Sequence, residues 1–269
     1  MNCKKRLSDK CSETINPYLH YGSLLYSRLI WDLSPYSWLS MSRIRRWKNK
    51  FKGKKAIILC NGPSLKKVDF RALQNSGIFT FGLNKINLIF KRTKFRPSAI
   101  VAVNPFVIEQ NTSYFNQTLI PLFIDHKGRN TIKFRRNVHF LHGTRGLRKF
   151  ARDCSISIAE GATVTFVAMQ LSFHMGFKYV ALTGCDHSFS TEGSPNQTVT
   201  SGISDTNHFD KNYFANGLKW QLPDLLASEL QYDTSKIIFN KNNRKIVNCT
   251  VGGNLEIFDR QTLADFLES

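Results

Sequence analysis

A run of apolar residues that ends in a polar turn constrains the fold of this chain more than any other segment. Residues 56–60 read Ala-Ile-Ile-Leu-Cys, and Asn61-Gly62-Pro63-Ser64 follows at once, leading into a helix-compatible stretch. An uninterrupted apolar run of this length is typical of a parallel strand buried on both faces. The segment therefore predicts a strand–turn–helix unit of an open α/β sheet, in which ligands bind at the carboxyl ends of the strands.

The turn after this strand has the composition of an anion-binding site. Gly62 lets the backbone approach a ligand closely. Ser64 and the free amides after it could hold a phosphate at the positive end of the helix that follows. The alternative is a plain joint between a strand and a helix, which needs no ligand.

Apolar runs alternate with helix-compatible segments along the rest of the chain. Strands are expected at residues 56–60, 78–83, 99–103, 119–124, 138–141, 179–183 and 245–249, and helices at residues 68–74, 85–91, 162–175, 223–240 and 261–267. Helix 162–175 is apolar on all sides, which is typical of the interior of a large fold. The alternation predicts an α/β fold with a doubly wound, mostly parallel, Rossmann-like sheet.

Composition divides the chain into two domains. Residues 1–53 are rich in aromatic and aliphatic side chains and end in basic residues, whereas the strand and helix pattern occupies residues 54–269. In the second domain, residues 190–217 are polar and lack a periodic pattern, which is typical of a lid over a site. Residues 18–55 have two interpretations: a segment that lies on an anionic membrane surface, or a helical extension that packs on the protein or on a second subunit.

The charge of the chain favours anionic partners. There are 38 Lys and Arg residues against 19 Asp and Glu residues, so the formal net charge is +19. A field of this sign attracts nucleotide phosphates, nucleic acid or an anionic membrane. Because no nucleic-acid-binding motif is visible, we predict no specific nucleic-acid partner. The basic residues between 127 and 152 bind an anionic acceptor or simply coat the surface, and nothing in the sequence indicates an oligomeric state.

The cysteines indicate a reducing compartment. The six cysteines are Cys3, Cys11, Cys60, Cys154, Cys185 and Cys249, and none of them forms a CxxC pair. Three of them, Cys60, Cys185 and Cys249, lie in strand-like contexts. This usage is typical of free buried thiols rather than of a zinc site or a disulfide framework. The N-terminus lacks the apolar core of a secretory signal, and no run approaches the ~20 apolar residues of a membrane-spanning helix. We expect a cytoplasmic protein, peripheral on the inner membrane if residues 18–55 bind lipid.

Three of the expected strands end in asparagine, at Asn61, Asn84 and Asn104. Asparagine is a common turn former, so each residue alone means little. At the ends of successive strands, however, the three amides would line one crevice suited to a sugar or a nucleobase.

Two further segments carry titratable groups. Asp186, in Gly184-Cys185-Asp186-His187, ends a fourth strand and could bind a metal, orient a ligand hydroxyl or cap a turn. His208 lies in the lid between Asp205 and Asp210. A histidine there could take a proton from an attacking hydroxyl while a flanking carboxylate fixes its tautomer. The alternative for His208 is a surface residue without a role.

Motifs of several enzyme classes are absent from the sequence. It contains no Asp-x-Asp, the metal-diphosphate grip of many nucleotide-sugar enzymes, and no G-x-x-x-x-G-K-[ST], G-x-G-x-x-G or G-x-S-x-G. These absences argue against P-loop kinases, dinucleotide-binding enzymes and hydrolases with a nucleophile elbow.

Taken in order, these motifs resemble those of a known family. Asn61-Gly62-Pro63-Ser64, Asn84, Asn104, the helix between Gly161 and Gly176, Gly184 with Asp186, and His208 resemble the bacterial sialyltransferases of glycosyltransferase family 42. They also resemble the wider DUF115, or 6-hydroxymethylpterin diphosphokinase MptE-like, group, and residues 161–189 look closer to that group. The resemblance covers about residues 54–260 and implies a GT-A-like variant of the α/β fold with a lid. It does not account for the N-terminal extension.

The resemblance implies a role for each matching residue. Asn61, Gly62 and Ser64 would hold the phosphate and ribose of a nucleotide, with Asp186 shaping the same site. Asn84 and Asn104 would contact the donor sugar or phosphate, and His208 would be the general base. The chain departs from the sialyltransferases at Glu160-Gly161-Ala162-Thr163, where Thr163 stands in for a serine contact. It also departs at Ser188 and Phe189, which stand where those enzymes have tyrosines that grip the donor phosphate. Ser188 and Tyr213 are the candidates for a phosphate contact here, and a basic residue is the alternative to Tyr213.

The leading functional hypothesis is therefore an inverting glycosyltransferase. It would move a sugar from a nucleotide-sugar donor, CMP-linked in the sialyltransferases, to a surface-glycan or glycolipid acceptor, without a metal or other cofactor. The alternative is an MptE-like pyrophosphokinase that transfers diphosphate from ATP to 6-hydroxymethylpterin, which needs Mg²⁺ held by carboxylates. A third hypothesis is a non-catalytic module that binds through its basic surface alone.

Overall fold

The computed structural model describes residues 16–144, 149–190 and 193–269. By its internal contacts the chain divides into two compact units, residues 1–39 and 40–269. Cys3, Cys11, Arg145 and Arg148, together with positions 191–192 of the predicted lid, lie outside the described residues.

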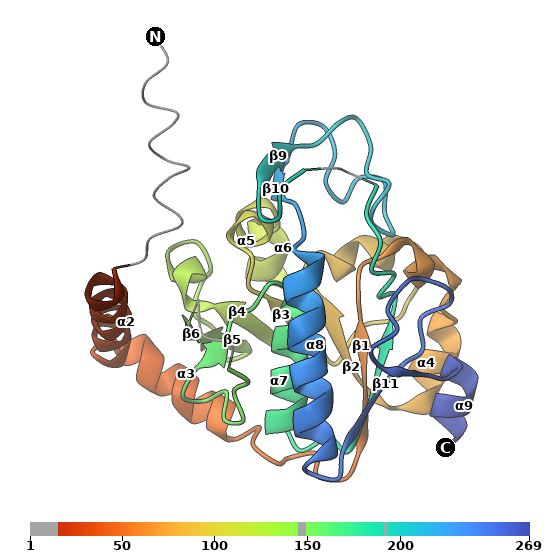
Figure 1. Cartoon of the computed structure of the whole chain (residues 1–269), viewed down its shortest axis with the longest axis horizontal. Coiled ribbons are helices and arrows are strands. Elements are labelled where there is room, and N and C mark those ends of the chain that lie inside the picture. Colours follow the sequence, from red (N-terminus) through yellow and green to blue (C-terminus); the bar gives the residue numbers. More distant parts are fainter. Residues whose placement is uncertain (1–15, 145–148, 191–192) are drawn as a thin grey trace. The chain divides into compact units, whose positions relative to one another are not determined.

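The second unit is built on an eight-stranded sheet in which every pairing is parallel (Figure 1). The strand order is β12 (Asp259–Arg260), β11 (Lys245–Asn248), β8 (Tyr179–Thr183), β1 (Lys55–Leu59), β2 (Phe79–Leu83), β3 (Ala99–Ala102), β4 (Leu122–Asp125) and β5 (Val138–Leu141). From β1 the chain runs outward through β2 to β5, and it later returns to β8 on the other side of β1. The direction of winding therefore reverses between β1 and β8, which is where ligands bind in open α/β sheets.

Burial explains why these segments form central strands. The side chains of Ala56, Ile57, Ile58 and Leu59 are fully inaccessible to solvent, because both faces of β1 are covered. Helix α7 (Val164–His174) packs across β1, β2 and β3, and every residue from Thr165 to His174 is buried. Helix α8 (Leu225–Asn240) lies beside α7 and packs against β11 (Figure 1). The prediction of an α/β fold with a mostly parallel, doubly wound sheet and an interior helix is confirmed.

The remaining helical segments of the second unit are short. They are η1 (Pro63–Lys67), α4 (Phe70–Ser76), η2 (Ile86–Lys91), α5 (Pro105–Gln110), α6 (Thr112–Gln117), η3 (His126–Asn130) and α9 (Leu263–Glu268). The sequence prediction lacks α5 and α6, which have six residues each. Asn104 caps α5 and Pro105 is its first residue, a pair typical of a helix N-terminus. The predicted strand at 119–124 begins only at Leu122, since Leu119 is 85% exposed.

The predicted lid has two structurally different parts. Its first part includes β9 (Thr198–Thr200), which pairs antiparallel with β10 (Lys219–Gln221) just beyond the predicted end of the lid. Its second part, residues 205–215, is packed into the unit, with Phe209 and Tyr213 each 1% exposed. A second small pairing, parallel, joins β6 (Gly143–Thr144) and β7 (Ile158–Ala159).

The first unit contains helix α2 (Pro17–Asp32), and α3 (Pro35–Arg45) includes the boundary between the units. The boundary lies earlier than the predicted one at 53–54. Residues 40–53 belong to the second unit because their aromatic side chains pack there: Phe51 stacks on Phe177 with ring centroids 5.0 Å apart. Among the described residues, no helix has both the length and the apolar character needed to cross a bilayer.

Candidate active site

The turn after β1 is fixed by a carboxylate from the end of β8. Asp186 Oδ2 accepts hydrogen bonds from the Ser64 amide at 3.1 Å and from the Ser64 hydroxyl at 2.7 Å. The predicted anion cradle at Ser64 is therefore filled by an anion of the protein itself. Among the roles considered for Asp186, its contacts match capping, and the turn it caps is the one that contains Pro63, not the one that follows β8.

Two glycines allow the ends of β1 and β8 to meet. A Cβ on Gly62 would collide with the Asp186 carboxylate and lie 2.7 Å from the Gly184 carbonyl oxygen. Gly184 has a φ of +72°, and a Cβ there would lie 2.8 Å from the Cys60 carbonyl oxygen. Both predicted site residues thus serve the close approach of two loops at the switch point of the sheet.

The three predicted asparagines lie at one edge of the sheet, because β1, β2 and β3 are neighbours. The side-chain oxygens of Asn61 and Asn84 are both buried and accept no hydrogen bond within the described part of the chain. Asn84 adopts a φ of +50°. Asn104 differs, because its side-chain oxygen caps α5 by accepting from Phe106 N and Val107 N. Two of the three amides therefore offer a free acceptor.

The second part of the lid covers these two amides. The Phe209 amide donates to the Asn61 carbonyl oxygen at 2.9 Å. The Tyr213 hydroxyl accepts from the amide of Lys85, the residue after Asn84, at 3.4 Å. Residues 205–215 therefore contact the carboxyl ends of β1 and β2, where the two free amide oxygens are buried.

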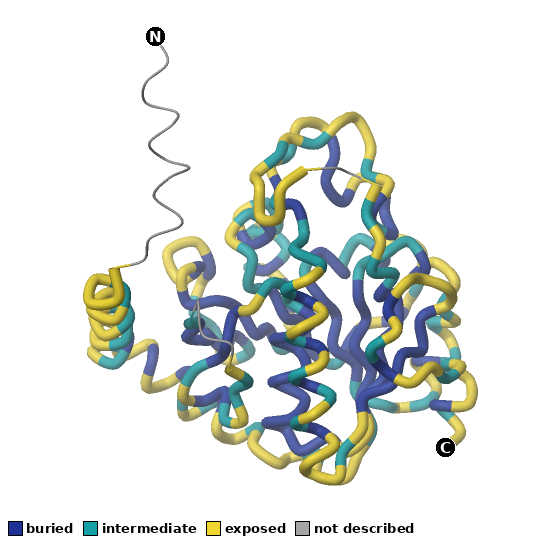
Figure 2. Tube along the Cα trace, viewed as in Figure 1, coloured by how far each residue is buried: buried dark blue, intermediate teal, exposed yellow. Residues whose placement is uncertain are grey.

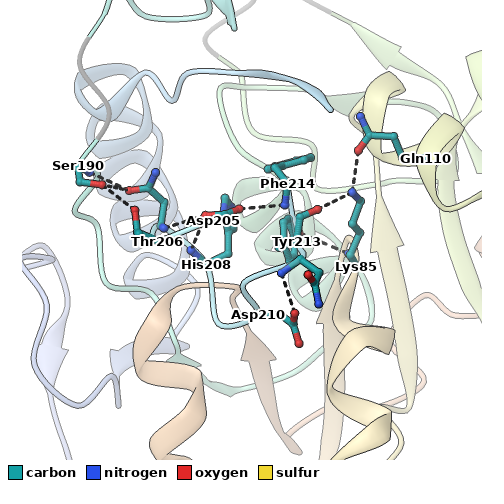
Figure 3. A network of polar contacts seen from close by, with 11 residues as sticks. Lys85, Gln110, Ser190, Asp205, Thr206, His208, Asp210, Tyr213 and Phe214 are labelled. Carbon is teal, nitrogen blue, oxygen red and sulfur yellow. Dashed lines mark hydrogen bonds and ion pairs between the residues drawn. The ribbon is translucent and has the colours of Figure 1, made fainter. Parts of the chain in front are cut away.

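Lys85, the residue after Asn84, fastens the lid to the sheet (Figure 3). Its Nζ donates to the Tyr213 carbonyl oxygen at 2.7 Å and to Gln110 Oε1 at 2.7 Å, and it lies 4.5 Å from the centre of the Phe214 ring. Lys85 is only 5% exposed. Burial lowers its pKa to about 8, an effect that the charge of Asp205 opposes.

His208 is held in the lid by a carboxylate and an aromatic ring. Its Nδ1 lies 2.8 Å from Asp205 Oδ2, and its ring stacks on Tyr213 with centroids 4.1 Å apart and planes 1° apart (Figure 3). Asp205 also accepts from the Asn207 and Phe214 amides. Burial alone would raise the pKa of Asp205, but the hydrogen bonds from His208 and these amides hold it below its ordinary value.

This arrangement prepares His208 to accept a proton. When Asp205 accepts a hydrogen bond from Nδ1–H, the other ring nitrogen, Nε2, carries the lone pair. Within the described residues, Nε2 of His208 forms no hydrogen bond. Of the two carboxylates that flank His208 in sequence, Asp205 is its partner, whereas Asp210 accepts from Asn212 N at 2.9 Å. Asp205 and His208 thus have the geometry of a general base and its orienting group.

Two predicted site residues near the start of α7, Gly161 and Thr163, have structural roles in the turn and the helix cap. Gly161 has a φ of +63°, and a Cβ there would crowd Phe166 and Gln231. Thr163 caps α7 by accepting from Thr165 N at 3.2 Å. The helix N-terminus nevertheless lies near the end of β1, since Thr165 Oγ1 is 3.6 Å from Cys60 Sγ.

The two candidates for a phosphate contact differ in accessibility. Ser188 is exposed, whereas Tyr213 is buried and its hydroxyl accepts from the Lys85 amide at 3.4 Å. Burial raises the pKa of Tyr213 above its ordinary value, so the hydroxyl stays neutral. The side chain of His187 is 7% exposed, and its Nε2 lies 2.9 Å from Glu229 Oε1 of α8.

The structure also assembles a polar cluster that the sequence analysis missed, at the carboxyl ends of β4 and β5. Asp125 Oδ1 lies 3.3 Å from His126 Nδ1, and the rings of His126 and His142 have centroids 4.9 Å apart. Nearby, Lys127 Nζ lies 2.8 Å from Glu160 Oε1. In the sequence, the neighbours Asp125 and His126 after an expected strand could have indicated this cluster. Lys127, a member of the predicted basic region, is thus paired rather than free.

A cationic cavity borders the second part of the lid. Its volume is about 230 Å³, and it is lined by Leu88, Lys91, Arg92, Asp210, Lys211 and Asn212. Arg92 lies 3.7 Å from Asp210, so one of the three cations is partly neutralised. The cavity is large enough for a phosphate or diphosphate group, and its charge suits one.

One comparison with known proteins, a family model, agrees with the motifs. A model of the family described as 6-hydroxymethylpterin diphosphokinase MptE-like matches residues 36–192. Among solved structures, the MAf glycosyltransferase from Magnetospirillum magneticum AMB-1 is 14% identical, with a TM-score of 0.49. That similarity covers 84% of this chain but only 38% of the other, so this chain spans well under half of its length. No curated protein matches the sequence.

Proposed function

Because the chain belongs to the 6-hydroxymethylpterin diphosphokinase MptE-like family, we propose that it is a transferase in which His208 activates an acceptor hydroxyl. The specific reaction that we propose is transfer of a sugar from a nucleotide-sugar donor to a glycan or glycolipid. The observation that carries the proposal is the Asp205–His208 pair, which the lid holds over the carboxyl ends of β1 and β2.

In the proposed reaction, residues of the protein account for the transferred proton, and the nucleotide phosphate is the leaving group. Nε2 of His208 takes the proton of the acceptor hydroxyl, and the oxygen attacks the anomeric carbon of the donor. The bond between that carbon and the nucleotide phosphate oxygen breaks, and its electron pair leaves with the phosphate. The positive charge that forms on His208 is stabilised by Asp205, which lies 2.8 Å away. The mechanism needs no metal.

The amides and the cationic cavity suit different parts of the donor. Asn61 and Asn84 offer buried acceptor oxygens, which match hydroxyl or amino groups of a sugar or a base rather than a phosphate. Since Asp186 already fills the predicted phosphate cradle, we propose that the donor phosphate binds Lys91 and Lys211 in the cavity beside the lid. A bound donor would then link η2 to the lid.

Turnover of nucleotide sugars tests this function. The purified protein should hydrolyse or transfer from at least one member of a panel of CMP-, UDP- and GDP-sugars, with and without EDTA. His208→Ala should lower that rate by ~100-fold or more, because general base catalysis contributes ~10²–10⁴. Retention of full turnover by His208→Ala would overturn the proposed base.

The family description favours a second candidate, transfer of diphosphate from ATP to a hydroxymethylpterin. An acceptor hydroxyl also attacks in that reaction, so His208 would serve as base in both. The difference lies in the metal: phosphoryl transfer requires Mg²⁺ to neutralise the phosphates. Consumption of ATP that requires both magnesium and 6-hydroxymethyldihydropterin would favour the second candidate, whereas EDTA-resistant sugar transfer would favour the first.

We propose that the protein works in the cytoplasm. The four cysteines among the described residues, Cys60, Cys154, Cys185 and Cys249, are free and buried. Unpaired thiols are typical of a reducing compartment.

A further inference from the structure

Helix α2 exposes apolar side chains where a helix of a globular protein normally exposes polar ones. Asn16 caps the helix by accepting from the Tyr18 and Leu19 amides at 3.0 and 3.3 Å. Exposed large apolar residues then recur along and beyond the helix; they are Tyr18, Leu19, Tyr21, Leu25, Tyr26, Leu29, Ile30, Leu33, Tyr36, Trp38 and Leu39, with exposed fractions from 40% to 87%. In Figure 2, the trace of α2 is accordingly coloured mostly as exposed.

These side chains form one face of the helix. At ~100° per residue, the positions from Tyr18 to Leu33 that are exposed and apolar fall within about half of the circumference. Ser27 and the buried Trp31 lie on the opposite half. The apolar face is therefore the outward one, which is the reverse of a surface helix that packs on its own core. A contiguous apolar patch of this kind marks an interaction surface.

The charges that follow this segment in the sequence are complementary to an anionic surface. Within α2 the charged residues are Arg28 and Asp32, and they form an ion pair of 2.7 Å. Directly after the apolar segment come exposed basic residues: Arg45, Arg46, Lys48, Lys50, Lys52 and Lys54. From residue 16 to residue 60, Asp32 is the sole acidic residue in the sequence. An uncharged face followed by a cationic run is the arrangement of proteins that bind anionic bilayers.

We propose that residues 16–54 bind the surface of an anionic lipid bilayer. Helix α2, about 24 Å long at 1.5 Å per residue, lies in the plane of the membrane with its apolar face at the boundary between headgroups and acyl chains. Tyr18, Tyr21, Tyr26, Tyr36 and Trp38 have an apolar ring with a polar edge, which suits the headgroup level. The basic residues that follow contact lipid phosphates. This inference does not depend on the proposed function.

A bilayer fits this face better than a second copy of the chain does. The formal net charge of +19 makes two copies repel each other, and the basic run follows the very segment that they would share. An anionic membrane instead attracts the same positive charge. Because salt screens this attraction, membrane binding should weaken as the salt concentration rises. Both the positive charge and the exposed apolar area of residues 16–54 therefore favour a bilayer as the partner.

Flotation of the full chain with lipid vesicles tests the proposal. The protein should float with vesicles of phosphatidylcholine and phosphatidylglycerol, and the bound fraction should fall in vesicles of phosphatidylcholine alone and in high salt. The double substitution Leu25→Asp with Leu29→Asp places two charges on the apolar face and should reduce partitioning by ~10-fold or more. Arg45→Glu with Arg46→Glu should reduce binding to the anionic vesicles selectively.

A matched control distinguishes loss of the apolar face from a general effect of added negative charge on α2. Ser23→Asp with Ser27→Asp adds the same two charges to α2 outside the apolar face, and it should retain most of the binding. Circular dichroism and thermal unfolding check that each variant is folded, which is expected because Leu25 and Leu29 are exposed.

Two results would overturn the proposal. One is flotation of the Leu25→Asp, Leu29→Asp variant equal to that of the wild type. The other is a wild-type dimer, seen by light scattering, that this variant dissociates while the wild type ignores vesicles; a second copy would then cover the face.

Discussion

Asp186 at the end of β8 holds Ser64 at the start of η1 through two hydrogen bonds, at 3.1 Å to the amide and 2.7 Å to the hydroxyl. The two loops that flank the switch point of the sheet are thereby joined by groups of the protein itself. The carboxylate occupies the donors that a phosphate would otherwise use. Donor recognition then falls to groups that remain free, namely the oxygens of Asn61 and Asn84 and the cations beside the lid.

Replacing Gly62 with alanine should destabilise the protein. A Cβ at this position meets the Asp186 carboxylate and the Gly184 carbonyl oxygen, and neither can withdraw without breaking the β1–β8 junction. We expect a loss of ~1–3 kcal/mol in the free energy of unfolding, measured by urea denaturation. Gly202→Ala is the control, since a Cβ there has no neighbour within 4 Å. Equal stability of the two variants would mean that the junction is looser than described.

Substitutions at Asp205 should separate orientation from proton transfer. Asp205→Asn keeps the shape of the side chain but removes the charge that orients and stabilises His208. If His208 is the base, Asp205→Asn should lower kcat by ~10-fold or more with a smaller change in KM.

The expected loss of kcat follows from the charge. Without the carboxylate, the positive charge that forms on His208 when it takes the proton loses its stabilising neighbour. Asp233→Asn is the control for the loss of one negative charge, because Asp233 is an exposed residue of α8. An unchanged kcat in Asp205→Asn would count against the proposed roles of Asp205 and His208.

The framework of the site was predictable from the sequence because it depends on local signals. Apolar runs that end in Asn identify the strands, and parallel strands align their carboxyl ends at one edge. This reasoning brings Asn61, Asn84 and Asn104 together before any coordinates. It could not tell that Asn104 serves as a helix cap, although Pro105 after it was a signal.

The parts that sequence reasoning missed depend on contacts between distant residues. Ser64 and Asp186 are separated by 122 positions, and Lys85 and Tyr213 by 128. A lysine after a strand normally predicts a solvated side chain, and only the packing of the lid shows that Lys85 is buried. Likewise, the polar composition of residues 205–215 predicts a mobile loop, whereas Asp205 satisfies enough backbone amides for the segment to pack closely.

Aspartate substitutions at the three asparagines should distinguish ligand contacts from structural ones. Asn61→Asp and Asn84→Asp place a charge next to the free acceptor positions, and we expect each to weaken binding of an anionic nucleotide-sugar donor by ~10-fold or more. Asn104→Asp should change binding less than ~3-fold, because aspartate caps a helix as well as asparagine does. Isothermal titration with the donor that the wild type accepts measures this. Equal losses at all three positions would indicate a general effect of charge.

Lys85 gives the protein a predictable dependence of stability on pH. Its pKa is lowered to about 8 in the folded state, against an ordinary value of 10.5. Between these two pH values the unfolded chain binds a proton at this position that the folded protein has released. Raising the pH through this window therefore stabilises the folded state, and below about pH 8 the contribution is constant.

The variant Lys85→Met keeps the length of the side chain and removes the titrating group. The free energy of unfolding of the wild type, minus that of Lys85→Met, should be flat below about pH 8 and rise between pH 8 and 10.5. Urea unfolding at several pH values measures this difference, in which other titrating groups cancel. Lys94→Met, at an exposed lysine, controls for the loss of a charge. A constant difference across the window would show that Lys85 is not buried beneath the lid in solution, and the lid would then be open before any donor binds.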